Sequence, residues 1–215
     1  MLPHVANAFS QGDMNKVNKM LYKSFDFVSA MAYPMMFGLA AISLTLAPKY
    51  YGSGYGPVGQ AMFIESVVIL MIGWSNVLGV QYLLPIHKQK EFTISVTLGA
   101  IVNVILNVPL IEMWGLNGAM IATSIAEFSV TLYQLFIVKR SLSLKDLFHG
   151  SWKYFISGLI MFIVVFWMNR NLKDSWLMLF LEIIVGIIIY AMFTLILRVP
   201  IIYEVRDLII KRLRK

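Results

Sequence analysis

Apolar residues are gathered into six long runs that are separated by short polar segments. The runs are continuous and do not alternate between apolar and polar positions, so they predict helices rather than strands. A helix needs about 20 apolar residues to cross a bilayer core, and each run is long enough to cross, although the fifth only just. The runs cover residues 25–47, 61–84, 92–111, 116–138, 154–168 and 176–197. The pattern therefore predicts an all-α, polytopic membrane protein with about six transmembrane helices.

The composition supports this prediction. Of the 215 residues, 59% are hydrophobic and 13% are charged, whereas a soluble domain is about half apolar and about a quarter charged. The absence of cysteine excludes disulfides and thiolate metal sites. The formal net charge of +7 resides in short segments between apolar runs, which indicates orientation in a membrane rather than nucleic-acid binding.

Lys and Arg are distributed unevenly among the segments that join the runs. Alternate segments carry 15 and 3 of them, and those rich in Lys and Arg are expected to face the cytoplasm. Six crossings then place both termini in the cytoplasm. On this interpretation residues 1–24 form an amphipathic segment near the lipid headgroups, residues 25–198 the transmembrane part, and residues 199–215 a basic tail along the inner leaflet.

Several polar side chains interrupt the apolar runs and are candidates for lining a cavity. Glu127 lies near the middle of the fourth run, and no Lys or Arg lies inside any run to pair with it, so it is expected to be protonated or to face water. The third and fourth runs carry small and polar residues at steps of four, and residues 112–115 join them in a predicted antiparallel hairpin. The candidate cavity residues are Glu65, Asn76, Asn103, Asn107, Thr123 and Glu127.

Simpler roles stay open for these groups. Asn and Thr in membrane helices often only hydrogen-bond a neighbouring helix, which is the alternative for Asn103 and Asn107. Glu65 lies near the end of its run, where water would solvate it, and the same holds for Asp26 and Glu182.

The sequence provides no positive evidence for catalysis. The three histidines are far apart, and neither a zinc-binding HExxH motif nor a pair of catalytic carboxylates is present. We therefore expect no metal, no cofactor and no enzymatic activity. The glycine-rich stretch at residues 51–57 lacks the Lys that follows in a phosphate-binding loop, and it is expected to be a flexible turn.

Several short pieces of residues 76–134 form a recognisable pattern. They include Asn76-Val-Leu-Gly79, Leu84-Pro85, Phe92-Thr-Ile-Ser-Val96, Gly99-Ala100, Leu106-Asn107 and Ile121-Ala-Thr123. In these pieces, residues 76–134 resemble the C-terminal half of bacterial polysaccharide flippases of the Wzx type, which transport O-antigen and capsule repeat units. These flippases belong to the MATE-like multidrug/oligosaccharidyl-lipid/polysaccharide exporter superfamily. The opening Leu2-Pro3-His4-Val-Ala6 and the run Pro34-Met-Met-Phe-Gly38 extend the resemblance over residues 1–140.

This resemblance implies one lobe of a two-lobed flippase in the bacterial inner membrane. The substrate implied is an undecaprenyl-pyrophosphate-linked oligosaccharide, whose sugar passes between the lobes while the prenyl tail stays in membrane lipid. The chain is expected to be a fragment or split half that needs an N-terminal lobe, with polysaccharide polymerase machinery as a further partner. The cytoplasmic cations expected to meet the pyrophosphate are Lys88, Lys90, Lys139 and Arg140.

Three alternatives remain on the sequence alone. The first is a multidrug or small-molecule exporter of the same superfamily. The second is a membrane-embedded transferase acting on a lipid-linked sugar, for which His87 and Glu91 are the one nearby acid–base pair. The third is a nonfunctional remnant, which would give no phenotype on deletion.

Overall fold

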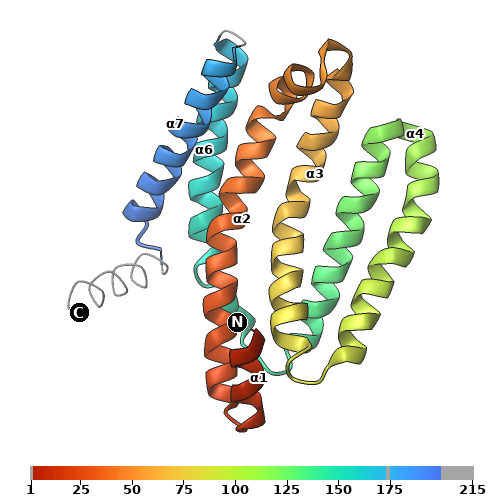
Figure 1. Cartoon of the computed structure of the whole chain (residues 1–215), viewed down its shortest axis with the longest axis vertical. Helices are drawn as coiled ribbons and strands as arrows, with labels where there is room; N and C mark the ends of the chain where they lie inside the picture. The colour runs from red at the N-terminus through yellow and green to blue at the C-terminus, as the bar shows by residue number, and fades with distance from the viewer. Residues whose placement is uncertain (1, 173–174, 200–215) are drawn as a thin grey trace.

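The computed structural model describes residues 2–172 and 175–199, and every regular element in these ranges is helical. Figure 1 shows α7, α6, α2, α3 and α4 side by side, with α2 in the middle of the bundle. The α-helices are α1 (Leu2–Ser10), α2 (Met14–Tyr51), α3 (Gly56–Ser75), α4 (Gln89–Val138), α5 (Leu144–Leu147), α6 (Ser151–Asn171) and α7 (Trp176–Ile196). A short 3₁₀ turn, η1 (Ser53–Tyr55), precedes α3, and a π-helix, η2 (Asn76–Leu83), continues it. The all-α prediction is confirmed.

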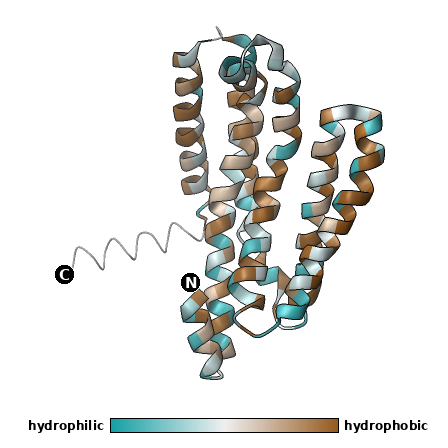
Figure 2. Cartoon of the chain, turned by 45° about the vertical axis from the view of Figure 1, so that its right-hand side comes forward, coloured by the Kyte–Doolittle hydropathy of each residue, from teal (hydrophilic) through white to brown (hydrophobic). Residues whose placement is uncertain are grey.

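Five of the described helices are long and apolar enough to cross a membrane. The helix α4 reverses direction at Gly115, so its two arms supply two crossings and the bundle has the six that the sequence predicts. Figure 2 shows apolar residues along most of the length of these helices. The chain is thus a multi-pass membrane protein.

Two glycines make the hairpin of α4 possible. Gly115 has a positive φ of 57°, which glycine adopts without steric cost. A Cβ atom at Gly118 would overlap the backbone carbonyl of Leu110 on the opposite arm. The arms therefore approach each other closely just below the turn because position 118 has no side chain. We call this end of the bundle the Gly115 end and the opposite end the α1 end.

The first crossing differs from the prediction, which separated an amphipathic segment at 1–24 from a span at 25–47. The structure divides this region at residues 11–13 instead, and α2 starts at Met14. The reason is local: the Asp13 side chain accepts a hydrogen bond from the backbone N–H of Lys16, 2.9 Å away, and so caps α2.

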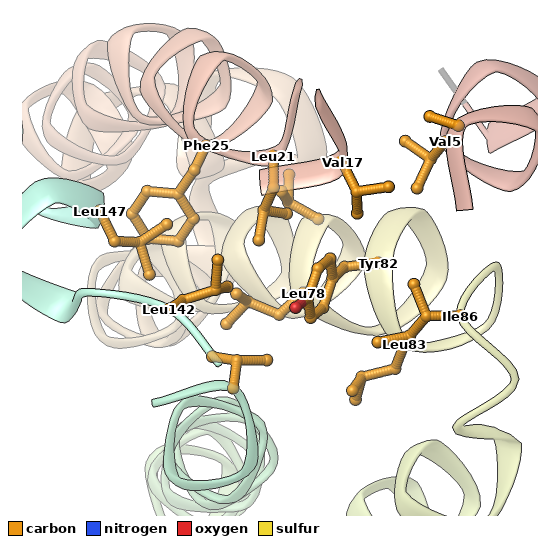
Figure 3. Packing of buried hydrophobic residues seen from close by; sticks show 13 residues of the cluster. Val5, Val17, Leu21, Phe25, Leu78, Tyr82, Leu83, Ile86, Leu142 and Leu147 are labelled. Carbon is orange, nitrogen blue, oxygen red and sulfur yellow. The ribbon is translucent and has the colours of Figure 1, made fainter. Parts of the chain in front are cut away.

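The helix α1 packs part of its apolar face against the rest of the protein. Val5 and Ala8 are buried, in one cluster with Val17, Tyr82 and other residues of α2 and η2 (Figure 3). An amphipathic sequence is expected whether the apolar face of a helix packs against protein or lies among lipid headgroups. The pattern alone therefore could not distinguish these two locations.

The ends of other predicted crossings differ from the observed helix ends by a few residues. The second crossing runs through α3 into the π-helix η2, and α6 has 21 residues where the sequence indicated a short span at 154–168. The predicted basic tail at 199–215 lies outside the described residues apart from Val199.

The sequence predicts that water solvates Glu182, and this prediction is wrong. The side chain is buried and hydrogen-bonded between helices. Its side chain is 3% exposed, and its Oε2 accepts a 2.8 Å hydrogen bond from Asn169 Nδ2. The hydroxyl of Thr45 donates to Asn169 Oδ1 at 2.6 Å, so these side chains join α2, α6 and α7. A buried carboxyl group requires such partners. Asp26 likewise accepts a hydrogen bond from the Tyr154 hydroxyl, 2.9 Å away.

Candidate functional site

A cavity of about 600 Å³ lies where α3 and η2 meet the two arms of α4. It brings together four of the six residues that the sequence proposes for a cavity, and these come from three crossing segments. The polar residues in its lining are Ser75, Asn76, Asn103, Thr123, Glu127 and Gln134. The remaining lining residues are apolar, so these polar groups interrupt an otherwise apolar surface.

Asn103 and Thr123 face each other across the hairpin. The Asn103 side-chain nitrogen donates to the Thr123 hydroxyl oxygen at 3.4 Å, which leaves both side chains at the cavity wall. Asn107 does not line the cavity. Its side-chain nitrogen donates to the side-chain oxygen of Asn103 at 2.7 Å and to the Asn103 backbone carbonyl at 2.9 Å, so it holds Asn103 in position.

Small residues at the seam between the arms of α4 set the shape of this wall. Ala122 and Ala126 are buried, and a Cβ atom at Gly99 would overlap Val130 on the other arm. The close approach of the arms leaves Glu127, which is partly buried, beside this seam and facing the cavity. The Thr131 hydroxyl donates to the Met71 carbonyl at 3.1 Å and ties the second arm to α3.

Gln134 is not among the six residues that the sequence proposes for a cavity, although it lies two turns beyond Glu127 on the same helix face. Its side chain is 1% exposed, and its Nε2 donates to the Ser95 hydroxyl at 3.0 Å. Gly79 makes room for it, because a Cβ atom there would lie 2.9 Å from Gln134 Nε2. The spacing of seven residues from Glu127 was the signal that pointed to it.

Glu65 does not join this cavity, although its spacing from Asn76 places both on nearly one face of a helix. It lines a second cavity of about 460 Å³ between α3 and α2, together with Leu39 and Ile69. Eleven residues of helix separate the two side chains by about 16 Å along the axis. A shared face therefore does not mean a shared site.

The four cations proposed for pyrophosphate lie at the α1 end of the hairpin. Lys88 directly precedes α4 and Lys90 is the second residue of this helix, while Lys139 and Arg140 follow its last residue. The Lys139 ammonium nitrogen lies 4.0 Å from the ring centroid of Phe136. Because the arms are antiparallel, both pairs are brought to the same end of the bundle.

The chemistry of the cavity lining is that of hydrogen bonding to neutral polar groups. Amides and hydroxyls both donate and accept, and Glu127 supplies the one carboxyl group of the lining. No Lys or Arg is among the residues that line this cavity. Within residues 2–172 and 175–199, no group of His, Asp and Glu is placed to hold a metal ion. His87, considered for transferase chemistry, packs edge-on against the Phe9 ring at 5.6 Å.

Comparison with known proteins gives two similarities, and no family model matches the chain. The chain is 22% identical to the lipid II flippase MurJ of Bacillus subtilis (strain 168) over 142 residues, which are 65% of this chain and 26% of that protein. It also superimposes on a solved structure of the lipid II flippase MurJ in an inward closed conformation, with a TM-score of 0.77 and 24% identity. That superposition covers 96% of this chain and 43% of the MurJ chain.

These similarities establish the fold of the chain and show that the matched proteins are flippases. The chain is similar in fold to the lipid II flippase MurJ, and it spans less than half the length of the proteins it matches. The Wzx-type resemblance is supported only at the coarser level of flippases for lipid-linked precursors. Both relatives are flippases, which are transporters rather than enzymes, so the chain is similar to transport proteins in both sequence and fold.

Proposed function

We propose that this chain is one lobe of a flippase that moves a lipid-linked saccharide from the inner to the outer leaflet of the bacterial inner membrane. The observation that carries the proposal is the cavity between α3, η2 and the hairpin of α4, which gathers Asn76, Asn103, Thr123 and Glu127. Saccharide hydroxyls both donate and accept hydrogen bonds, and amide and carboxylate side chains match that chemistry. Polar groups at membrane depth are otherwise costly.

The lining also indicates which part of the substrate this lobe contacts. Because no cation lines the cavity, the sugar rather than the pyrophosphate is the part that fits it. The cations at the α1 end of α4, Lys88, Lys90, Lys139 and Arg140, are the groups suited to the pyrophosphate when the α1 end faces the cytoplasm. This orientation follows from the uneven distribution of Lys and Arg among the loops.

The opposing wall of the translocation path would come from a second lobe. Alternating access by rocking of two lobes around a central site is the general mechanism of such transporters. We assign the substrate to an undecaprenyl-pyrophosphate-linked oligosaccharide for surface polysaccharide synthesis, with polysaccharide polymerase machinery acting afterwards. The relatives are lipid II flippases, which favours a lipid-linked substrate over the soluble compound of a drug exporter.

A flipping assay in proteoliposomes tests the proposal. The chain is reconstituted together with its N-terminal lobe, and an impermeant lectin reports how much lipid-linked oligosaccharide reaches the opposite leaflet. We expect Asn103→Leu to lower the rate at least tenfold, whereas Ser129→Ala leaves it unchanged. Ser129 is a matched control on the same helix, since its hydroxyl donates to Ile125 of that helix and it does not line the cavity. Equal flipping rates for wild type and Asn103→Leu would show that the cavity takes no part in flipping.

A further inference from the structure

The second arm of α4 has two faces of opposite character. Ala126, Val130 and Gln134 are buried and line the polar cavity. On the opposite side, a row of large apolar side chains stays exposed, and its members lie three or four residues apart, a spacing that places them on one helix face. We call this row the outer stripe of α4. It consists of Ile125, Phe128, Leu132 and Phe136, each between 42% and 49% exposed.

The outer stripe is about as long as one leaflet of the bilayer. Phe136 follows Ile125 by eleven residues, which is about 16 Å of helix, and half of the hydrocarbon core is about 15 Å thick. Phe136 lies in the last turn of α4, at the α1 end of the bundle. Figure 1 shows α4 at the edge of the bundle, with α3 as its neighbour. The stripe therefore extends from the headgroup level of one leaflet to near the middle of the membrane.

Two cations lie at the headgroup end of the outer stripe. The ammonium nitrogen of Lys139 is 4.0 Å from the centroid of the Phe136 ring, and the guanidinium carbon of Arg140 is 5.7 Å from the same centroid. Both distances are typical of cation–π contacts. Because Phe136 is on the exposed face, these contacts place the two cations beside the stripe, on the side of the helix away from the buried Gln134.

The charge of this pair is not neutralised by the segment that carries it. Residues 128–145 contain no Asp or Glu, and Lys139 and Arg140 are both exposed. Two cations beside an apolar row complement a molecule that has an anionic group and an apolar body. With the α1 end facing the cytoplasm, the pair lies in the leaflet whose anionic lipids attract cations.

We propose that Lys139, Arg140 and the outer stripe of α4 form a binding site for an anionic phospholipid of the cytoplasmic leaflet. The phosphate diester accepts hydrogen bonds from the ammonium and guanidinium groups, and one acyl chain lies along Leu132 and Phe128. This inference goes beyond the proposed function, because it gives Lys139 and Arg140 a ligand when no lipid-linked saccharide is present.

Native mass spectrometry of the 215-residue chain in detergent tests the site. The chain is titrated with phosphatidylglycerol or with phosphatidylcholine, which has the same acyl chains and no net charge. We expect wild type to bind phosphatidylglycerol at least tenfold more tightly than phosphatidylcholine, and Lys139→Gln/Arg140→Gln to lose this preference. Lys16→Gln/Lys19→Gln is the matched control. It removes the same charge from two exposed lysines of α2 and should keep the preference.

A charge-preserving variant guards against loss of folding. Lys139→Arg/Arg140→Lys should retain the preference for phosphatidylglycerol, and all variants should keep the thermal unfolding midpoint of wild type. Equal binding of the two lipids by wild type would overturn the proposal, and so would an unchanged preference in Lys139→Gln/Arg140→Gln.

Soluble glycerophosphate distinguishes a lipid site from a site for phosphate alone. It has no acyl chain to lie on the outer stripe, so an equimolar amount should leave bound phosphatidylglycerol in place. Displacement of the lipid would show that phosphate alone is recognised and would overturn the proposal. None of these outcomes depends on flipping, so failure of the lipid site and failure of the proposed function are separate results.

Discussion

Asn103 donates a hydrogen bond to Thr123, 20 residues further along the chain, and so connects the two arms of α4 beside the polar cavity. Asn107 in turn donates to Asn103, so three polar side chains form one chain of hydrogen bonds within the hairpin. Hydrogen bonds between membrane helices contribute typically about 0.6 kcal/mol and rarely more than about 2 kcal/mol. The arrangement thus positions the cavity wall more than it stabilises the fold.

A double-mutant cycle measures this link. Asn103→Ala, Thr123→Val and the double variant are unfolded in mixed detergent micelles, and the free energies of unfolding are compared. We expect a coupling energy of about 0.6 kcal/mol. A coupling of zero would mean that the two side chains do not interact.

Gly118→Ala is expected to destabilise the hairpin. The added Cβ would overlap the Leu110 carbonyl, and forcing an extra carbon into a packed contact costs about 1–3 kcal/mol. Thermal unfolding in detergent measures the loss. Gly54→Ala is the matched control, because a Cβ at Gly54 has no atom within 4 Å, and its unfolding midpoint should stay at the wild-type value.

The buried contact between Glu182 and Asn169 predicts a contrast between two substitutions. Glu182→Gln keeps an oxygen that accepts the Asn169 hydrogen bond, so stability should change little. Glu182→Leu leaves the Asn169 side-chain nitrogen without its acceptor, and an unpaired buried donor costs about 1–3 kcal/mol. Chemical denaturation measures the free energy of unfolding of both variants. Equal values for the two variants would indicate that water accepts the Asn169 hydrogen bond when the carboxylate is absent.

Glu127→Gln tests the one carboxyl group of the polar cavity. A carboxylate accepts stronger hydrogen bonds from hydroxyl groups than an amide does, so we expect flipping to slow about tenfold while folding is unaffected. The lectin-accessibility assay gives the rate, and circular dichroism checks the helix content. Unchanged surface polysaccharide and unchanged ion dependence in cells carrying this variant would exclude Glu127 from the mechanism.

Cysteine labelling tests the orientation, and the chain has no cysteine to remove. Met113→Cys lies next to the hairpin turn and Gln11→Cys lies between α1 and α2, and both native side chains are exposed. An impermeant maleimide added to intact cells should label position 113 but not position 11, because basic loops face the cytoplasm. Labelling of both positions would contradict the proposed six crossings.

The number of crossings followed from the sequence because each crossing must be apolar over about 20 residues. The hairpin was also predictable, since only residues 112–115 separate two such runs. Four candidate cavity residues were identifiable because a polar side chain at membrane depth needs a polar neighbour or water. The sequence alone did not indicate that Glu182 is buried, because a carboxylate near a helix end has the same pattern whether it is solvated or paired.

The sequence by itself thus determined the crossings, the hairpin and the types of side chain available, since these depend on local hydropathy and on glycine. Only the tertiary structure decided that α1 packs on η2, that Glu65 and Asn76 line different cavities, and that Ile72 lines both of these cavities. These relationships depend on how helices far apart in the chain lie against one another. Helical periodicity specifies which face a side chain occupies but not which neighbour that face meets.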